Sequence, residues 1–151
     1  MVASLTTRYF DEVEIGDEFT EEQTAGKDDV LRFFKMAASA RMGAGRGGDD
    51  RFVNEKAGRR LGAEGPIVPG IMSFAMLSRL VTDWMGASGH LDNLDISFRR
   101  PISHGDTLRL VALVTDTDEA AAQVKLDVYM ENTRGERPLQ GTAIVRLPRR
   151  E

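Results

Sequence analysis

The stretch "GIMSFAMLSRLVTDWM", residues 70–85, is apolar on almost every side when it is drawn as a helix. Its only polar interruptions are Ser73, Ser78, Arg79, Thr82 and Asp83. A helix with so little polar surface belongs inside its domain, because a surface helix keeps one broad polar face. We therefore expect residues 70–85 to form a central helix that the other elements cover, with Trp84 shielded near its end.

Downstream of this helix the hydrophobic pattern changes from a helical period to a period of two. Apolar and polar side chains alternate over residues 94–98 and 124–130, and residues 107–115 form a continuous apolar run typical of a buried strand. The stretch "NTRGE" (132–136) is typical of a hairpin turn, after which residues 139–147 return as a last strand. Four meandering strands imply an antiparallel sheet, which can bury the central helix only by curling around it.

Upstream of the central helix we expect one strand and two further helices. The strand covers residues 17–24, and residues 27–42 carry apolar side chains at helical spacing. Asn54 is a plausible N-cap for a short helix that ends near Gly62. The sequence thus predicts one α+β domain over residues 1–151, an antiparallel sheet of about five strands wrapped around a long central helix.

Composition excludes several classes of function. The chain has 151 residues, a net charge of −4 and no cysteine, so we expect neither nucleic-acid binding nor disulfides nor thiolate zinc sites. Its only histidines, His90 and His104, lie far apart in stretches that read as surface loops, so no metal site is expected. No segment approaches 18 continuous apolar residues and the N-terminus lacks a signal-peptide pattern, which favours a cytoplasmic protein that does not enter a membrane.

Four stretches in order resemble the MaoC-like acyl-thioester hydratases and dehydratases, which have the hot dog fold. They are "RYFDEVEIGDEF" (8–19), "KDDVLRFFKMAA" (27–38), "GPIVPGIMSFAML" (65–77) and "ISFRRPISHGDTLRL" (96–110). In that family an aspartate, and a histidine five residues later, activate water and protonate the α-carbon of an enoyl thioester. One group accepts a proton while the other donates one near pH 7, which suits histidine.

The stretch "GGDDRFVNEKAG" (47–58) covers the positions of this family dyad. When Asn54 is matched to the helix-capping residue of the family, Gly47 takes the aspartate position and Phe52 the histidine position. Neither side chain can transfer a proton, so the resemblance implies that the dyad is absent. Nearby acids are the alternative: Asp50 and Glu55 keep the five-residue spacing if the loop shifts, and a thioesterase could use Asp49, Asp50 or Glu64.

The resemblance also implies a substrate site at the start of the central helix. The backbone N–H of Gly70 matches the family group that polarises the thioester carbonyl, with Pro69, Ile71 and Phe52 beside the acyl group. The alternative is that Pro69 and Gly70 only initiate the helix. Arg59 and Arg60 are candidates for the phosphates of coenzyme A. No cofactor is expected other than the CoA or acyl carrier protein that carries the substrate.

The stretch "VTDWMGASGHL" (81–91) resembles the small subunit of actinobacterial steroid side-chain enoyl-CoA hydratases, which are heteromers of two MaoC-like chains. The resemblance implies a subunit that shapes the acyl pocket while another chain supplies the dyad. Replacing the dyad by Gly47 and Phe52 fits this role, because it removes buried polar groups and leaves an apolar wall. Two alternatives remain open: a homodimer that binds acyl thioesters without catalysis, and a thioesterase that uses repurposed loop acids.

Overall fold

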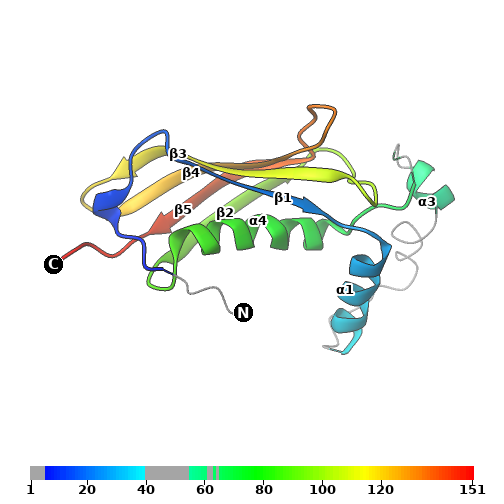
Figure 1. Ribbon diagram of the computed structural model, residues 1–151, viewed down its shortest axis with the longest axis horizontal. Helices are drawn as coiled ribbons and strands as arrows, with labels where there is room; N and C mark the ends of the chain where they lie inside the picture. Colours follow the sequence, from blue (N-terminus) through cyan, green and yellow to red (C-terminus); the bar gives the residue numbers. More distant parts are fainter. Residues whose placement is uncertain (1–5, 40–54, 61–62, 64) are drawn as a thin grey trace.

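Five strands form one antiparallel sheet that lies along one long helix, as Figure 1 shows. The computed structural model describes residues 6–39, 55–60, 63 and 65–151. The strands are β1 (Glu18–Thr24), β2 (His90–Phe98), β3 (Thr107–Asp118), β4 (Gln123–Glu131) and β5 (Leu139–Arg146). The helices are α1 (Lys27–Ser39), α3 (Glu55–Arg60) and α4 (Gly70–Met85), and a 3-10 turn covers Phe10–Glu12. The central helix has the predicted bounds.

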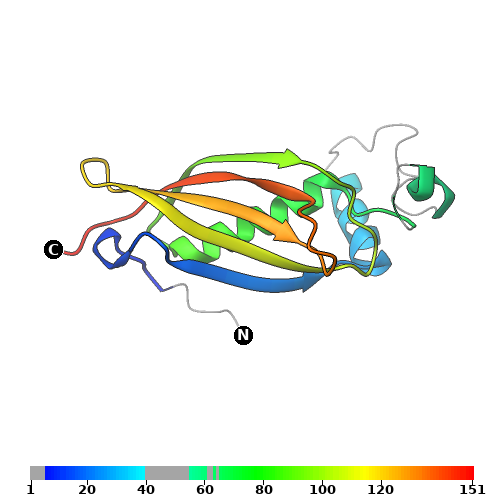
Figure 2. The same ribbon diagram turned by 90° about the horizontal axis from the view of Figure 1, so that it is seen from above.

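The strands follow one another across the sheet in the order β1-β3-β4-β5-β2 (Figure 2). Every neighbouring pair is antiparallel, as expected, but only β3, β4 and β5 form a meander, because β2 pairs with β5 at the far edge and not with β3, which follows it in the chain. β1 and β2 therefore form the two edges of this sheet. β2 lies so close to β5 at Gly141 that a Cβ there would meet the carbonyl oxygen of Asp95 at 1.8 Å.

The core lies between the sheet and α4. The alternation in β4 buries Val124, Leu126, Val128 and Met130, while the residues between them face outward. α4 contributes Leu77, Leu80, Val81 and Trp84 from one side. Trp84 is 5% exposed, as expected, and its carbonyl oxygen accepts a hydrogen bond from Arg8 Nε at 2.6 Å. Burial of this apolar area is the main stabilising term of the fold.

One face of α4 stays outside the chain's own sheet. Figure 1 shows the sheet on one side of the helix. The opposite side carries Ile71, Ala75, Arg79 and Asp83, spaced four apart and all exposed, with Ile71 54% exposed. Residues at this spacing share one helix face. The near-continuous apolar character of α4 therefore exceeds what its own sheet covers.

The polar ends of two strands extend beyond the apolar pattern. β3 continues to Asp118, which pairs with Gln123 in the hairpin to β4, although the apolar run ends near residue 115. β2 begins at His90, which pairs with Arg146, so His90 lies in a strand and not in the expected loop. Backbone pairing holds these ends without burial, so hydrophobic periodicity gives no signal for them.

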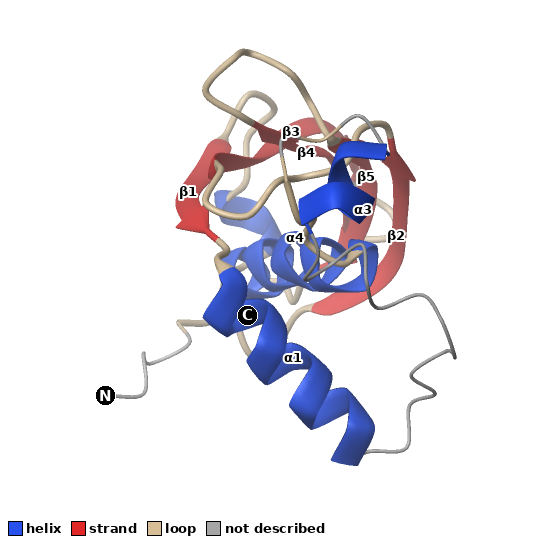
Figure 3. Ribbon diagram, turned by 90° about the vertical axis from the view of Figure 1, so that its right-hand side faces the viewer, coloured by secondary structure: helices blue, strands red, loops and turns tan. Residues whose placement is uncertain are grey.

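α1 and α3 lie at the end of the molecule where α4 begins, as Figure 3 shows. α1 packs through Val30, which is fully buried with Ile67, while Phe34 and Met72 cover the contact. Residues 40–42, the end of the predicted helix 27–42, lie outside the described residues. Asn54, the predicted N-cap of the short helix, lies outside them as well. Both described helices therefore border the N-terminus of α4.

Candidate functional site

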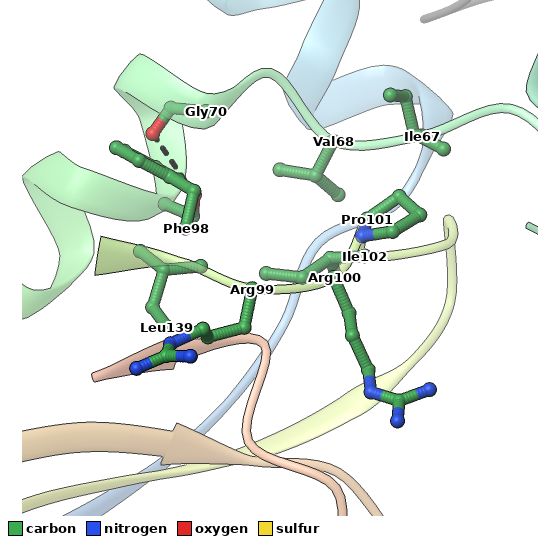
Figure 4. Close-up of a pocket in the computed structure, with 10 residues that line it drawn as sticks. Ile67, Val68, Gly70, Phe98, Arg99, Arg100, Pro101, Ile102 and Leu139 are labelled. Carbon is green, nitrogen blue, oxygen red and sulfur yellow. Dashed lines mark hydrogen bonds between the residues drawn. The ribbon is translucent and has the colours of Figure 1, made fainter. Parts of the chain in front are cut away.

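An open cleft of about 390 Å³ lies at the N-terminus of α4. Figure 4 shows that its lining comes from residues 67–73, from residues 98–102 after β2, and from Leu139. The first two segments are tied together, because Val68 N–H donates to the carbonyl oxygen of Ile102 at 2.7 Å and His104 N–H to that of Pro66 at 3.0 Å. The cleft is therefore built from well-connected backbone at one end of the sheet.

The first amides of α4 face this cleft without a partner. The carbonyl oxygen of Pro69 accepts hydrogen bonds from the amides of Met72 at 3.0 Å and Ser73 at 3.2 Å. The N–H groups of Gly70 and Ile71 find no acceptor within the part of the chain that the structure describes. Unpaired amides at the positive end of a helix favour an oxygen that carries negative charge.

Ser73 fixes the first peptide of the helix. Its side chain is 1% exposed, and its Oγ donates to the carbonyl oxygen of Gly70 at 2.9 Å. Because a trans peptide points its C=O and N–H in opposite directions, this bond also sets the direction of the Ile71 N–H. Sequence analysis treated Ser73 only as an interruption of an apolar helix. A short polar residue at the fourth position of such a helix is the signal that could have marked it.

Phe98 is the second residue that the sequence analysis did not assign to the site. A Cβ at Gly70 would meet ring carbon Cε1 of Phe98 at 3.2 Å, so the ring lies against the glycine (Figure 4). The ring is nevertheless 56% exposed, because Phe98 ends the edge strand β2. Large exposed aromatic side chains at a cleft are typical of ligand or protein contacts. Glycine at position 70 thus makes room for this ring.

Two adjacent arginines at the cleft rim, Arg99 and Arg100, differ in their ion pairs. Arg100 Nη1 lies 2.7 Å from Glu136 Oε2, and Arg134 Nε lies 2.8 Å from Glu136 Oε1. The hydrogen bond from Arg134, with help from Asn132 and the charge of Arg100, holds the pKa of Glu136 below its usual range. No described residue forms an ion pair with Arg99. The rim therefore carries an excess of positive charge within the described part of the chain, with Arg99 as the arginine that has no described carboxylate partner.

The structure places some of the predicted site residues and leaves others outside its description. Pro69, Gly70 and Ile71 lie at the start of α4, as expected. Gly47 and Phe52, which occupy the dyad positions, lie outside the described residues. The same holds for the alternative acids, which are Asp49, Asp50, Glu64 and the side chain of Glu55. Their predicted roles stay predictions.

The predicted phosphate contacts and His90 do not line the cleft, whereas His104 lies directly behind its lining. Arg59 and Arg60 are exposed at the end of α3 and do not line the cleft. His90 is exposed, whereas His104 is half-buried with its Nε2 3.2 Å from the carbonyl oxygen of Ile67. Among the described residues, no cluster of His, Asp and Glu is suited to hold a metal ion, and no described helix is long and apolar enough to cross a membrane.

An antiparallel sheet packed along a central helix, with free amides at the start of that helix, defines a protein of the hot dog fold. The chain belongs to the MaoC-like domain family, whose model matches residues 52–135, more than half of its length. This confirms the resemblance seen in the sequence. The family groups hydratases with dehydratases. No curated protein matches the chain by sequence.

Solved structures of this fold are similar over nearly the whole chain. The (R)-hydratase from A. caviae involved in PHA biosynthesis has a TM-score of 0.75 and 22% identity, covering 91% of this chain and 98% of that one. R-hydratase PhaJ1 from Pseudomonas aeruginosa has a TM-score of 0.78 and 17% identity, covering 94% and 86%. The ChsH1-ChsH2 complex from Mycobacterium tuberculosis has a TM-score of 0.70 and 17% identity, covering 89% and 98%. At these identities the likeness shows the fold.

Proposed function

We propose that this chain is a subunit of a MaoC-like enoyl-thioester hydratase or dehydratase, and that it forms the acyl pocket while a partner chain supplies the catalytic aspartate and histidine. The observation that carries the proposal is the N–H of Gly70, which has no acceptor among the described residues, in a cleft whose described lining holds no acid–base group. Such a lining can bind and polarise a thioester carbonyl, but the described residues cannot by themselves move a proton.

The chemistry divides into two parts. In hydration, a base removes a proton from water, the water oxygen bonds to the β-carbon, and an acid protonates the α-carbon. Negative charge that develops on the thioester oxygen is stabilised by N–H donors fixed in advance, the role we assign to Gly70. Among the described residues lining the cleft, the only titratable side chains are Arg99 and Arg100. Arginine keeps its proton at neutral pH, so it cannot serve as the base.

The acid–base pair is the missing part. Gly47 and Phe52 stand where the resemblance places the aspartate and histidine. General acid–base groups typically contribute about 10²–10⁴-fold in rate, so a chain without them is nearly inert alone. A second chain that keeps the pair would complete the reaction.

Two exposed features support the docking of a second MaoC-like chain. The edge strand β2 leaves backbone groups available for pairing, and natural proteins rarely leave a nine-residue edge unprotected. Ile71 and Phe98, both more than half exposed, lie on the adjacent surface of α4 and β2. The structural neighbours include the ChsH1-ChsH2 complex and the HadBC complex, a (3R)-hydroxyacyl-ACP dehydratase. We therefore assign this surface to a second chain of the same fold.

Purification of the tagged chain from its native cells tests the proposal. We expect a second MaoC-like chain to co-purify in a fixed ratio, with an aspartate and a histidine five residues apart, identified by mass spectrometry. Recovery of a homodimer alone that binds butyryl-CoA would favour a non-catalytic acyl-thioester-binding protein instead. Turnover of butyryl-CoA to free CoA by the pure chain would favour a thioesterase.

A further inference from the structure

Arg99 and Arg100 line the same cleft in adjacent positions but differ in their electrostatic surroundings. The guanidinium of Arg100 is neutralised by Glu136 at 2.7 Å. Arg99 is exposed, and no carboxylate of the described residues pairs with it. A guanidinium has five N–H donors in a rigid fork, which suit two oxygens of one phosphate. Arg99 is therefore the cation of the cleft that is available to an anion.

The backbone holds Arg99 at the rim, away from the helix amides. Its N–H donates to the carbonyl oxygen of Pro138 at 2.7 Å, which anchors the residue where β5 begins. Figure 4 shows the head group of Arg99 beside Leu139, on the opposite side of the backbone of residues 98–102 from Gly70. The cleft lining thus holds Gly70, whose N–H we assign to the carbonyl, and, across this backbone, a cation without a described carboxylate partner.

We propose, on the basis of the proposed function, that Arg99 binds a phosphate of the pantetheine-based carrier whose thioester carbonyl lies at Gly70. An acyl thioester of this kind has its carbonyl at one end of a long neutral arm and its phosphate at the other. Gly70 and Arg99 both line the cleft and lie on opposite sides of the backbone of residues 98–102, as two separate contacts of one such ligand require. This assignment is separate from the prediction for Arg59 and Arg60, which are not among the residues that line the cleft.

Three butyryl thioesters serve as probes for the full chain. They are the esters of pantetheine, which has no phosphate, of 4′-phosphopantetheine, which has one, and of coenzyme A. The 4′-phosphate is common to CoA and to acyl carrier protein, whereas the nucleotide phosphates belong to CoA alone. Calorimetric titration of each ester measures which phosphate the protein recognises.

Arg99→Gln is the test variant and Arg100→Gln its matched control. The control removes the same charge from the adjacent position and leaves Glu136 paired with Arg134. Loss of one exposed arginine–phosphate contact should weaken binding by about five- to tenfold. We expect this loss for Arg99→Gln with a phosphorylated ester, less than about twofold for Arg100→Gln, and no change for butyryl-pantetheine with either variant.

The pattern of losses identifies the carrier. A loss with both phosphorylated esters places Arg99 at the 4′-phosphate, and a loss with butyryl-CoA alone places it at the nucleotide phosphates of CoA. Unchanged affinity of Arg99→Gln, equal losses in both variants, or an equal loss with butyryl-pantetheine would overturn the assignment. If the wild-type chain binds butyryl-pantetheine, the carbonyl site stands even when the Arg99 assignment fails. If it binds none of the three esters, the proposed function fails with it.

Discussion

A side chain at Gly70 would disturb two features of the cleft. One is the N–H of Gly70, which has no acceptor among the described residues, and the other is the ring of Phe98, which lines the same cleft. The sequence alone explains the glycine by ligand approach, because glycine has no Cβ. The structure adds that a Cβ would lie 3.2 Å from the ring. Both causes act at the same atom, and a pair of variants can separate them.

We predict that Gly70→Val weakens butyryl-CoA binding by at least tenfold, because the side chain obstructs the carbonyl site and displaces Phe98. The stability cost should be about 1 kcal/mol, since overpacking costs more only where the neighbour cannot move and this ring is exposed. Binding is measured by calorimetry and stability by urea unfolding. In the background Phe98→Ala the stability cost should vanish while the binding loss remains. Recovery of binding there would show that Gly70 acts only through the ring.

Sequence reasoning found some site residues and missed others for a physical reason. Pro69 and Gly70 were found because a helix start and a family motif mark them in the linear sequence. Phe98 was read as one more inward residue of an alternating strand, because alternation cannot reveal that a strand lies at an edge. The roles we assign to Ser73 and Arg99 depend on groups that lie near each other only when the chain is folded. Glu136 pairs with Arg100, whereas Arg99 has no carboxylate partner among the described residues.

At the scale of the element, α4 has two faces with different expected roles. Leu77 is fully buried against the sheet, whereas Ile71 is 54% exposed. Leu77→Ala should cost about 2–5 kcal/mol of unfolding free energy through lost burial and a cavity. Ile71→Ala should cost less than about 0.5 kcal/mol in the isolated chain. Urea unfolding measures both.

The same pair of variants tests where the partner chain docks. Ile71→Ala should weaken assembly with a MaoC-like partner, as measured by sedimentation, because its exposed side chain lies on the surface we assign to that chain. If Ile71→Ala leaves assembly unchanged while destabilising the isolated chain as much as Leu77→Ala, this face of α4 is not the interface.

The turn between β4 and β5 should be sensitive to acid. Hydrogen bonds from Arg134 and Asn132 and the charge of Arg100 lower the folded pKa of Glu136 from its ordinary value. A lowered folded pKa stabilises the protein above the unfolded pKa, and this contribution disappears as the pH falls through the folded value. We predict that the difference in unfolding free energy between wild type and Glu136→Gln shrinks from pH 6 to pH 3. A difference that stays constant with pH would contradict this role.

For the molecule as a whole, the central helix made the fold predictable. An apolar helix followed by four successive strands predicts an antiparallel sheet over the helix, which the structure has, although β2 lies at the edge beside β5 and not in a meander with β3. The uncovered face of α4 could not be predicted, because an all-apolar helix gives the same pattern whether its own domain or another chain covers it. The bounds of β2 and β3 were missed at polar residues that only backbone pairing holds.

Restoring the dyad should restore some catalysis to the single chain. The double variant Gly47→Asp, Phe52→His should gain measurable hydration of crotonyl-CoA, although poorly, because a newly introduced pair also needs neighbouring groups that orient it. Each single variant should gain less, since the two groups act as a unit. Histidine in an apolar position costs roughly 1–3 kcal/mol if it is unsatisfied, so folding is checked first by circular dichroism. The control Gly47→Asn, Phe52→Gln should stay inactive; equal activity in it would contradict a restored dyad.

The rate at which the pure wild-type chain hydrates crotonyl-CoA, followed by loss of enoyl absorbance, tests the central claim most directly. We predict no more than a trace rate for the chain alone, and a strong increase when a MaoC-like partner with an intact dyad is added. Robust hydration by the wild-type chain alone would contradict the account. In that case Asp49, Asp50 and Glu55 would become the first candidates for the catalytic acids.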